Sequence, residues 1–102
     1  MVEQYLLLQK MLQEAGIPFE THLRPEIMGF QLEYPNRAVQ ECSVVIGAYS
    51  YGGDEGLLEI MGLLTEEERE IDSVKGYLTA EDVFSRIQKH WQENGGAADG
   101  RA

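Results

Sequence analysis

The stretch ECSVVIGAYSYGGDEGLLEIMGLL, residues 41–64, decides how the rest of the chain is interpreted. In it an apolar run, residues 44–48, meets a glycine-rich turn and is followed by a second apolar run. Strand, glycines and helix in this order are typical of phosphate-binding loops, which use free backbone N–H groups and a following lysine. Here Gly52 and Gly53 lead into two acids, and the nearest following lysine is Lys75. Because carboxylates repel a phosphate, we interpret the glycines as a structural turn.

The two sides of this turn carry different expectations. The strand before it, residues 41–50, is the most apolar of the chain, which predicts a central place in the sheet. The glycines are expected to supply positive φ angles where the chain reverses. After them, Asp54 is expected to cap a short helix. The apolar side chains of that helix would be Leu57, Leu58, Met61 and Leu64.

The N-terminal half predicts one helix and two further strands. Apolar side chains recur at helical spacing over residues 2–15. Gly16 suits the left-handed residue that ends a helix, and Pro18 prevents its continuation. Residues 19–24 and 30–34 then alternate between apolar and polar side chains, as half-buried strands do. The short connections between strands predict antiparallel pairing.

The C-terminal half is expected to be helical. Thr65 and Glu68 form a capping-box pattern that opens an acidic turn or helix ending near Asp72. Gly76 is expected to break the chain, and Thr79 to cap a last helix. The apolar stripe of that helix is Val83, Phe84, Ile87 and Trp91.

Together these elements predict an α+β fold. An N-terminal helix is followed by a three-stranded antiparallel sheet and then by two or three C-terminal helices, with the helices packed on one face. With 102 residues the chain is long enough for one compact domain, which we place at residues 1–93, and residues 94–102 are expected to form a flexible tail. No run is apolar enough to span a membrane, and the start lacks the basic region of a signal peptide, so a cytoplasmic location is expected.

The charge of the chain points to protein partners. The formal net charge is −10, and most of it falls after residue 53. Such a surface repels nucleic-acid backbones and attracts basic protein surfaces. The candidate partner-binding acids are Glu66, Glu67, Glu68, Glu70, Asp72, Glu81 and Asp82.

A second candidate surface is the sheet face that a single layer of helices leaves uncovered. It combines polar side chains with a few apolar ones, which suits contact with a neighbour. Tyr49 and Tyr51 would share a face there, and Tyr34 could join them in an aromatic patch. The candidates on this face are His22, Glu33, Val45, Tyr49 and Tyr51.

No catalytic, metal-binding or cofactor-binding group is assigned. Cys42 lies in an apolar strand and is interpreted as a small buried side chain. His22 and His90 are far apart in the sequence, and His90 borders the apolar stripe of the last helix. A zinc site needs more nitrogen or sulfur ligands than these three residues clearly supply. Glu33 or Ser43 could lie beside His22 across strands, but the sequence leaves the register open.

Residues 43–91, SVVIGAYSYGGDEGLLEIMGLLTEEE…GYLTAEDVFSRIQKHW, resemble small acidic proteins encoded by phages and mobile elements of Gram-positive bacteria. The resemblance lies in a short acidic chain with a capped C-terminal helix and no catalytic motif. It implies a phage or accessory protein. Several phage-encoded inhibitors of host defence are similarly short, acidic and mixed α/β, and some present carboxylates in place of DNA phosphates.

Three functions remain open at this point. The first is a non-enzymatic binding protein whose acids occupy a basic groove of another protein, in its strong form by DNA mimicry. The second is a homodimer or structural subunit that buries the open sheet face. The third is a small enzyme or ligand-binding domain centred on His22, Glu33 and Tyr49.

Overall fold

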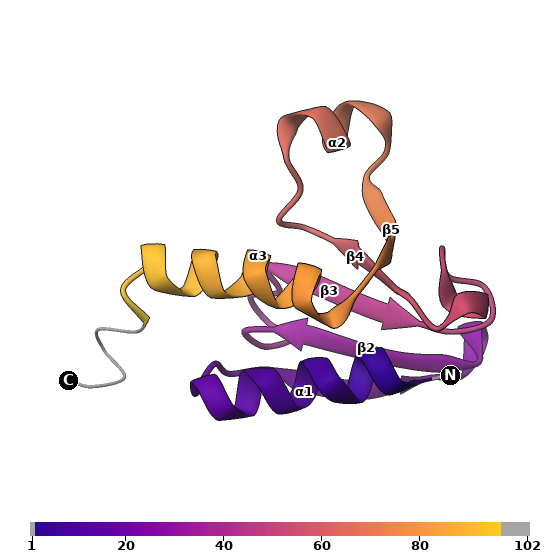
Figure 1. Cartoon of the computed structure of the whole chain (residues 1–102), viewed down its shortest axis with the longest axis horizontal. Helices are drawn as coiled ribbons and strands as arrows, with labels where there is room; N and C mark the ends of the chain where they lie inside the picture. Colours follow the sequence, from indigo (N-terminus) through magenta and orange to yellow (C-terminus); the bar gives the residue numbers. More distant parts are fainter. Residues whose placement is uncertain (1, 97–102) are drawn as a thin grey trace.

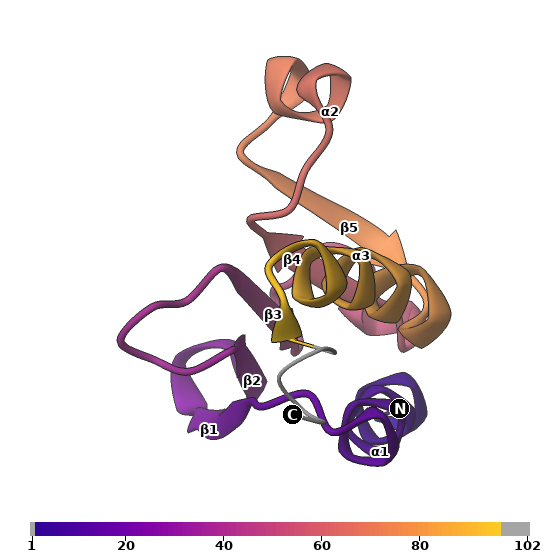
Figure 2. The ribbon, with the colours of Figure 1, turned by 90° about the vertical axis from the view of Figure 1, so that its left-hand side faces the viewer.

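The computed structural model of the chain describes residues 2–96, which form an α+β fold. Five strands make one antiparallel sheet in the order β1-β2-β3-β4-β5. Helices α1 (Glu3–Ala15) and α3 (Ala80–Glu93) pack side by side against this sheet (Figures 1 and 2). The predicted N-terminal helix, antiparallel sheet and C-terminal helices are confirmed, whereas the expected three strands are five. Most of the predicted tail, residues 97–102, lies outside the described residues.

Helix α1 ends as its sequence predicts. Gly16 adopts a left-handed conformation with φ of 72°, and its N–H donates to the Gln13 carbonyl. The Ile17 N–H donates to the Leu12 carbonyl at 3.0 Å, and both side chains are buried. The helix therefore stops with its last carbonyls satisfied and turns the chain toward the first strand.

Strand β3 (Cys42–Ile46) occupies the centre of the sheet, as its apolar sequence predicts. It pairs with β2 (Gly29–Tyr34), which in turn pairs with β1 (Glu20–Arg24). The register places Thr21, Leu32, Val44 and Ile60 in one row across the helix-covered face. Their neighbours along each strand therefore point to the opposite face, which we call the open face.

The prediction of a helix after the glycine-rich turn is wrong. A short 3-10 turn, η2 (Gly53–Glu55), lies there instead, and Gly52 rather than Asp54 precedes it without a side-chain cap. Strand β4 (Leu58–Met61) follows, with Leu58 and Ile60 buried. The buried side chains of β4 alternate, as in a strand, over only four residues. Because Leu57, Leu58 and Met61 also fit helical spacing, the sequence predicted a helix. Of the two glycines expected to have positive φ angles, Gly52 does, with φ of 91°, and Gly53 does not; Gly56, after the 3-10 turn, has φ of 77°.

The break expected at Gly76 is also wrong, because this residue lies inside β5 (Val74–Leu78). A Cβ atom at Gly76 would collide with the Cβ atom of Tyr51. The glycine thus lets the loop before η2 approach the strand, and the Tyr77 N–H donates to the Tyr51 carbonyl at 3.2 Å. The glycine marks a close approach between backbones rather than a chain break.

Residues 62–73, between β4 and β5, form a projection that we call the arm. Its tip is helix α2 (Glu66–Ile71), which stands away from the sheet and from α1 in both views (Figures 1 and 2). The predicted capping box is present: the Glu68 N–H donates to the Thr65 hydroxyl, and the Thr65 N–H donates to the Glu68 carboxylate. The tip is therefore ordered by its own capping contacts.

The last helix, α3, follows its sequence closely. The Thr79 hydroxyl accepts from the Asp82 N–H, and the Asp82 carboxylate accepts from the Thr79 N–H. Val83 and Ile87 are fully buried, and Trp91 packs against the same core. None of the helices within residues 2–96 has the length and apolar character needed to cross a membrane.

Candidate functional site

The arm gathers exposed acids on one projecting element. It carries five acids and a single base, Arg69. Helix α2 buries no residue, and the apolar side chain of Ile71 is 86% exposed. Glu66, Glu67 and Glu70 are exposed and form no ion pair or hydrogen bond through their carboxylates within residues 2–96. The tip thus presents free negative charge around one apolar side chain.

Arg86 of α3 holds both the base and the helix of the arm to the rest of the fold, the sheet with α1 and α3, which we call the body. Its Nη1 and Nη2 atoms donate to the two carboxylate oxygens of Glu68 at 2.8 and 2.7 Å, and Nη1 also donates to the Leu63 carbonyl at 2.9 Å. Both charged side chains are mostly shielded from water. The hydrogen bonds from Arg86 and from the Thr65 backbone lower the pKa of Glu68 to about 2. A bidentate pair of this kind fixes orientation as well as charge.

The seven predicted acids do not play equal parts. Glu68 is committed to Arg86, and Asp82 is committed to the cap of α3. Glu81 is exposed at the start of α3. A hollow of about 690 Å³ lies between the base of the arm and α3, with Thr65 on one side and Asp82 on the other. The acids free to meet a partner from the arm itself are Glu66, Glu67, Glu70 and Asp72, although the Asp72 carboxylate also accepts from the Ser73 N–H.

A network of hydrogen-bonded polar side chains covers part of the open face of the sheet. Gln31, Glu33 and Ser43 point to this face and are nevertheless buried. The Gln31 amide donates to the Ser43 hydroxyl at 2.6 Å, and Arg24 Nη1 donates to Gln31 Oε1 at 2.6 Å. The network satisfies its members across three strands, so this half of the open face is polar and filled.

His22 and Glu33 meet on this face, as the alternation of both strands allows. His22 Nε2 lies 2.5 Å from Glu33 Oε1, and Gln40 Nε2 donates to Glu33 Oε2. Glu20 stands directly opposite Glu33 across the β1–β2 ladder. Donor atoms of Glu20, His22 and Glu33 all lie within 4.8 Å of one another. Of these three, Glu20 was not a candidate in the sequence, although its spacing from His22 places both side chains on one strand face.

The expected aromatic patch does not form as a unit. Val45 and the exposed Tyr49 line a cleft of about 200 Å³ on the open face, together with Met61. Tyr51 is exposed and held through its backbone N–H, which donates to Glu59 Oε1 at 2.7 Å. Tyr34 is buried on the helix-covered face, where its hydroxyl lies 2.7 Å from His90 Nδ1. Its position two residues from Leu32 in β2 puts it on the core side, so adding it to the patch was wrong.

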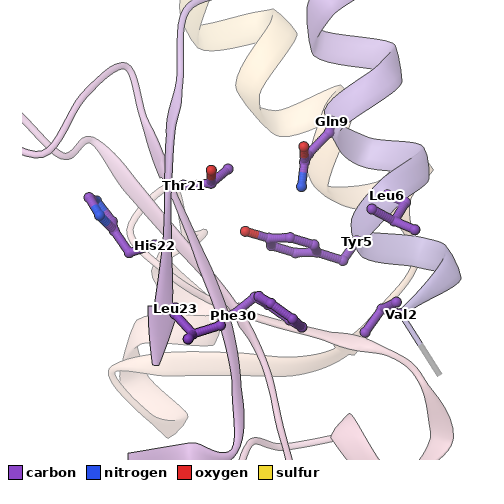
Figure 3. A pocket seen from close by; sticks show the side chains of 8 residues that line it. All are labelled: Val2, Tyr5, Leu6, Gln9, Thr21, His22, Leu23 and Phe30. Atoms are coloured by element: carbon purple, nitrogen blue, oxygen red, sulfur yellow. The ribbon is translucent and has the colours of Figure 1, made fainter. Parts of the chain in front are cut away.

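An apolar groove of about 320 Å³ runs between α1 and strands β1 and β2 (Figure 3). Tyr5, Thr21 and Phe30 point into the space beside α1, whereas His22 leaves β1 on the opposite side. The Tyr5 hydroxyl donates to the Gln31 carbonyl at 2.8 Å, and burial raises the pKa of Tyr5 to about 12. His22 nevertheless borders the groove, so the groove adjoins the His22 cluster, while its tyrosine serves the core.

The remaining reactive side chains are used by the fold. Cys42 is buried, and burial raises the pKa of its thiol to about 12, which keeps it protonated and unreactive at neutral pH. His90 contacts Tyr34 through Nδ1, and its Nε2 lies 3.6 Å from Glu41 Oε1. Both the interpretation of Cys42 as a buried side chain and that of His90 as a boundary residue agree with these contacts.

Comparison with protein-family models, with curated proteins and with solved structures finds no match for this chain.

Proposed function

We propose that this chain is a non-enzymatic cytoplasmic protein that binds a basic surface of another protein through the acids of its arm. The observation that carries the proposal is the exposure of Glu66, Glu67 and Glu70, whose carboxylates have no partner among residues 2–96, on an element that projects from the body. Acids that only solubilise a protein need no such concentration on one projection. A projecting element can also enter a concave site that the body cannot reach.

Two further features favour binding over passive charge. The bidentate contact of Arg86 with Glu68 holds helix α2 before any partner arrives, which lowers the ordering cost of association. The exposed Ile71, at the C-terminal end of α2 between Glu70 and Asp72 in the sequence, offers an apolar contact beside the acids. A small apolar contact ringed by charge is the usual anatomy of a specific protein interface.

The strong form of the proposal is mimicry of DNA. In it the arm carboxylates occupy positions that a nucleic-acid-binding protein reserves for phosphates, and the chain acts as an inhibitor encoded by a phage or mobile element. This form draws on the acidity of the chain and on its resemblance to small acidic phage proteins. It predicts competition with DNA for the same partner, whereas binding of any other basic surface does not.

The test is an affinity capture from a lysate of Gram-positive bacteria at low salt, followed by measured affinity for each captured protein. The arm variant replaces Glu66, Glu67 and Glu70 with glutamine. The control variant replaces Glu14, Glu55 and Glu93, which are exposed on the body, with glutamine, so its net charge equals that of the arm variant. Loss of binding in the arm variant alone supports the proposal. Equal affinity of both variants for the captured protein rejects it.

A second candidate is a homodimer formed through the open sheet face. It is favoured by the exposure of Tyr49 at 75% and of Met61 at 52%, on either side of Val45 in the same cleft. Light scattering over a range of concentrations measures it directly, and Val45→Lys should dissociate such a dimer without unfolding it. A concentration-independent monomer rejects this candidate.

A further inference from the structure

The two end strands on one side of the sheet bring together two carboxylates and an imidazole. Glu20 and Glu33 are direct cross-strand partners, and His22 lies two residues along β1 from Glu20 on the same face. Like charges directly opposite each other destabilise a strand pair. A candidate ligand atom from each of the three side chains lies within 4.8 Å of the other two. The strand pairing thus places two carboxylates beside an imidazole, and all three groups are good metal ligands.

Glu33 is the unusual member of this cluster because it is only 3% exposed. A buried carboxylate is normally paired with a fixed cation or coordinated to a metal. No lysine or arginine in residues 2–96 forms an ion pair with Glu33, and its partner His22 is charged only when protonated. Arg24, nearby on β1, is engaged with Glu26 and Gln31 instead. The site therefore lacks a permanent positive charge.

Neighbouring groups orient the two carboxylates. Gln40 Nε2 donates to Glu33 Oε2, which leaves Oε1 facing His22. The Arg37 backbone N–H donates to Glu20 Oε1 at 2.9 Å, and the other carboxylate oxygen of Glu20 has no hydrogen-bond partner among residues 2–96. Hydrogen bonds of this kind to the outer atoms of ligands are typical supports of metal sites.

We propose that Glu20, His22 and Glu33 bind a divalent transition-metal ion, with Zn²⁺ as the best fit. One imidazole and two carboxylates suit Zn²⁺ better than Mg²⁺ or Ca²⁺, which prefer oxygen ligands alone. Zinc lies about 2.0–2.2 Å from such ligands, so small side-chain movements bring all three donor atoms into range. His22 is 26% exposed, which gives the ion access from solvent and room for a water ligand.

The sequence predicted no metal site, and the reason is the register. Glu20 and His22 can be placed on one strand face by alternation, but two ligands with one nitrogen make no recognisable pattern. Glu33 joins them only because η1 (Pro25–Ile27) and the left-handed Met28 set the length of the β1–β2 connection. The ligand set is therefore a product of strand pairing rather than of a local motif.

The test is titration of the full chain with Zn²⁺ in competition with a chromophoric chelator, beside the variants His22→Gln and Glu20→Gln. The matched control is His90→Gln, which removes the other histidine and its contact with Glu41. We expect one equivalent of Zn²⁺ to bind, both cluster variants to weaken it by at least about tenfold, and the control to bind as the wild type does. Binding unaffected by the cluster variants, or lost equally in the control, overturns the proposal.

A measurement on the unmodified chain guards against variants that simply unfold. The ring ¹⁵N and ¹H signals of His22 should shift on addition of one equivalent of Zn²⁺, while those of His90 stay in place. Mg²⁺ and Ca²⁺ at the same concentration should leave both histidines unchanged. A Zn²⁺ response confined to His90, or no response from His22, overturns the proposal without any substitution.

Discussion

The body and the arm of this protein are built on opposite principles. In the body, α1, α3 and one face of the sheet bury a continuous apolar core, and even the polar open face hides Gln31, Glu33 and Ser43. In the arm, helix α2 buries nothing and carries mostly acids (Figure 1). A segment without apolar burial contributes little to folding. Helix α2 is thus free to vary its surface, whereas the body and the buried Leu64 at the base of the arm are not.

The two regions meet at the base of the arm, where Leu64 is buried in the core and Leu63 packs against it, and at Arg86. Arg86 joins α3 to Glu68 and to the Leu63 carbonyl, and Arg69 Nη1 donates to the Leu64 carbonyl inside the arm itself. The contrast teaches that helix α2 is held by a charged contact, while the base of the arm and the body depend on packing. Substitutions in each region should show separately how much the charged contact and the apolar packing contribute to stability.

The largest contrast is expected between one buried and one exposed apolar residue. Leu12→Ala removes a fully buried side chain of α1 and should lower the free energy of unfolding by about 2–5 kcal/mol. Ile71→Ala truncates the exposed side chain of the arm and should change it by less than about 0.5 kcal/mol. Urea denaturation measures both. Similar losses in the two variants would show that the arm is part of the core.

Removing the anchor should have an intermediate effect. Arg86→Ala breaks the bidentate contact with Glu68 and should cost about 1.5–3 kcal/mol, since hydrogen bonds between charged groups are the strong ones. Hydrogen exchange should speed up across α2 while α1 keeps its protection. The exposed Lys89 of the same helix is the control, and Lys89→Ala should leave exchange unchanged. Unaltered exchange in the arm of Arg86→Ala would mean that other contacts hold it.

The same contact should show in the pH dependence of stability. Because Arg86 lowers the pKa of Glu68 to about 2, the ionised form stabilises the fold. That stabilisation is complete above the pKa of an unfolded glutamate and is lost as the pH falls toward 2. The stability advantage of wild type over Glu68→Gln should therefore be about 1–2 kcal/mol near pH 6 and fade below about pH 4.5. An advantage that persists at pH 2 contradicts the assignment.

The smallest effects are expected at the two helix caps. Thr79→Ala removes the cap of α3, a core helix, and should cost about 1 kcal/mol. Thr65→Ala removes the cap of α2 and should cost about 0.5 kcal/mol or less, because that helix buries no residue. Thermal unfolding compares them. A larger loss for Thr65→Ala would place α2 among the elements that determine global stability.

How far the sequence predicts this molecule differs along the chain. The end of α1 at Gly16, the central β3 and both capping boxes follow from local signals and agree with the structure. Strand β4 was missed because it has only four residues and apolar side chains that also fit helical spacing, and β5 because Gly76 interrupts its sequence. Glycine at position 76 looked like a break, when its lack of a side chain lets Tyr51 approach.

The candidate sites show the same limit. The acids of the arm are visible in the sequence, but their projection from the body follows from the pairing of β4 with β5, which the sequence did not reveal. The link between Glu68 and Arg86 spans 18 residues and has no local signature. The cluster of Glu20, His22 and Glu33 likewise depends on register. The candidate side chains could be identified from the sequence, whereas the contacts between them depend on the fold.

The measurement that tests the central claim most directly is the salt dependence of partner binding by three chains. These are the wild type, the variant with Glu66, Glu67 and Glu70 replaced by glutamine, and the control with Glu14, Glu55 and Glu93 replaced. Exposed charge contacts are screened over about 10 Å at 0.1 M salt, so affinity should fall steeply with salt for the wild type and the control. We predict a clearly shallower dependence for the arm variant alone. The same slope in all three chains would contradict a binding surface on the arm.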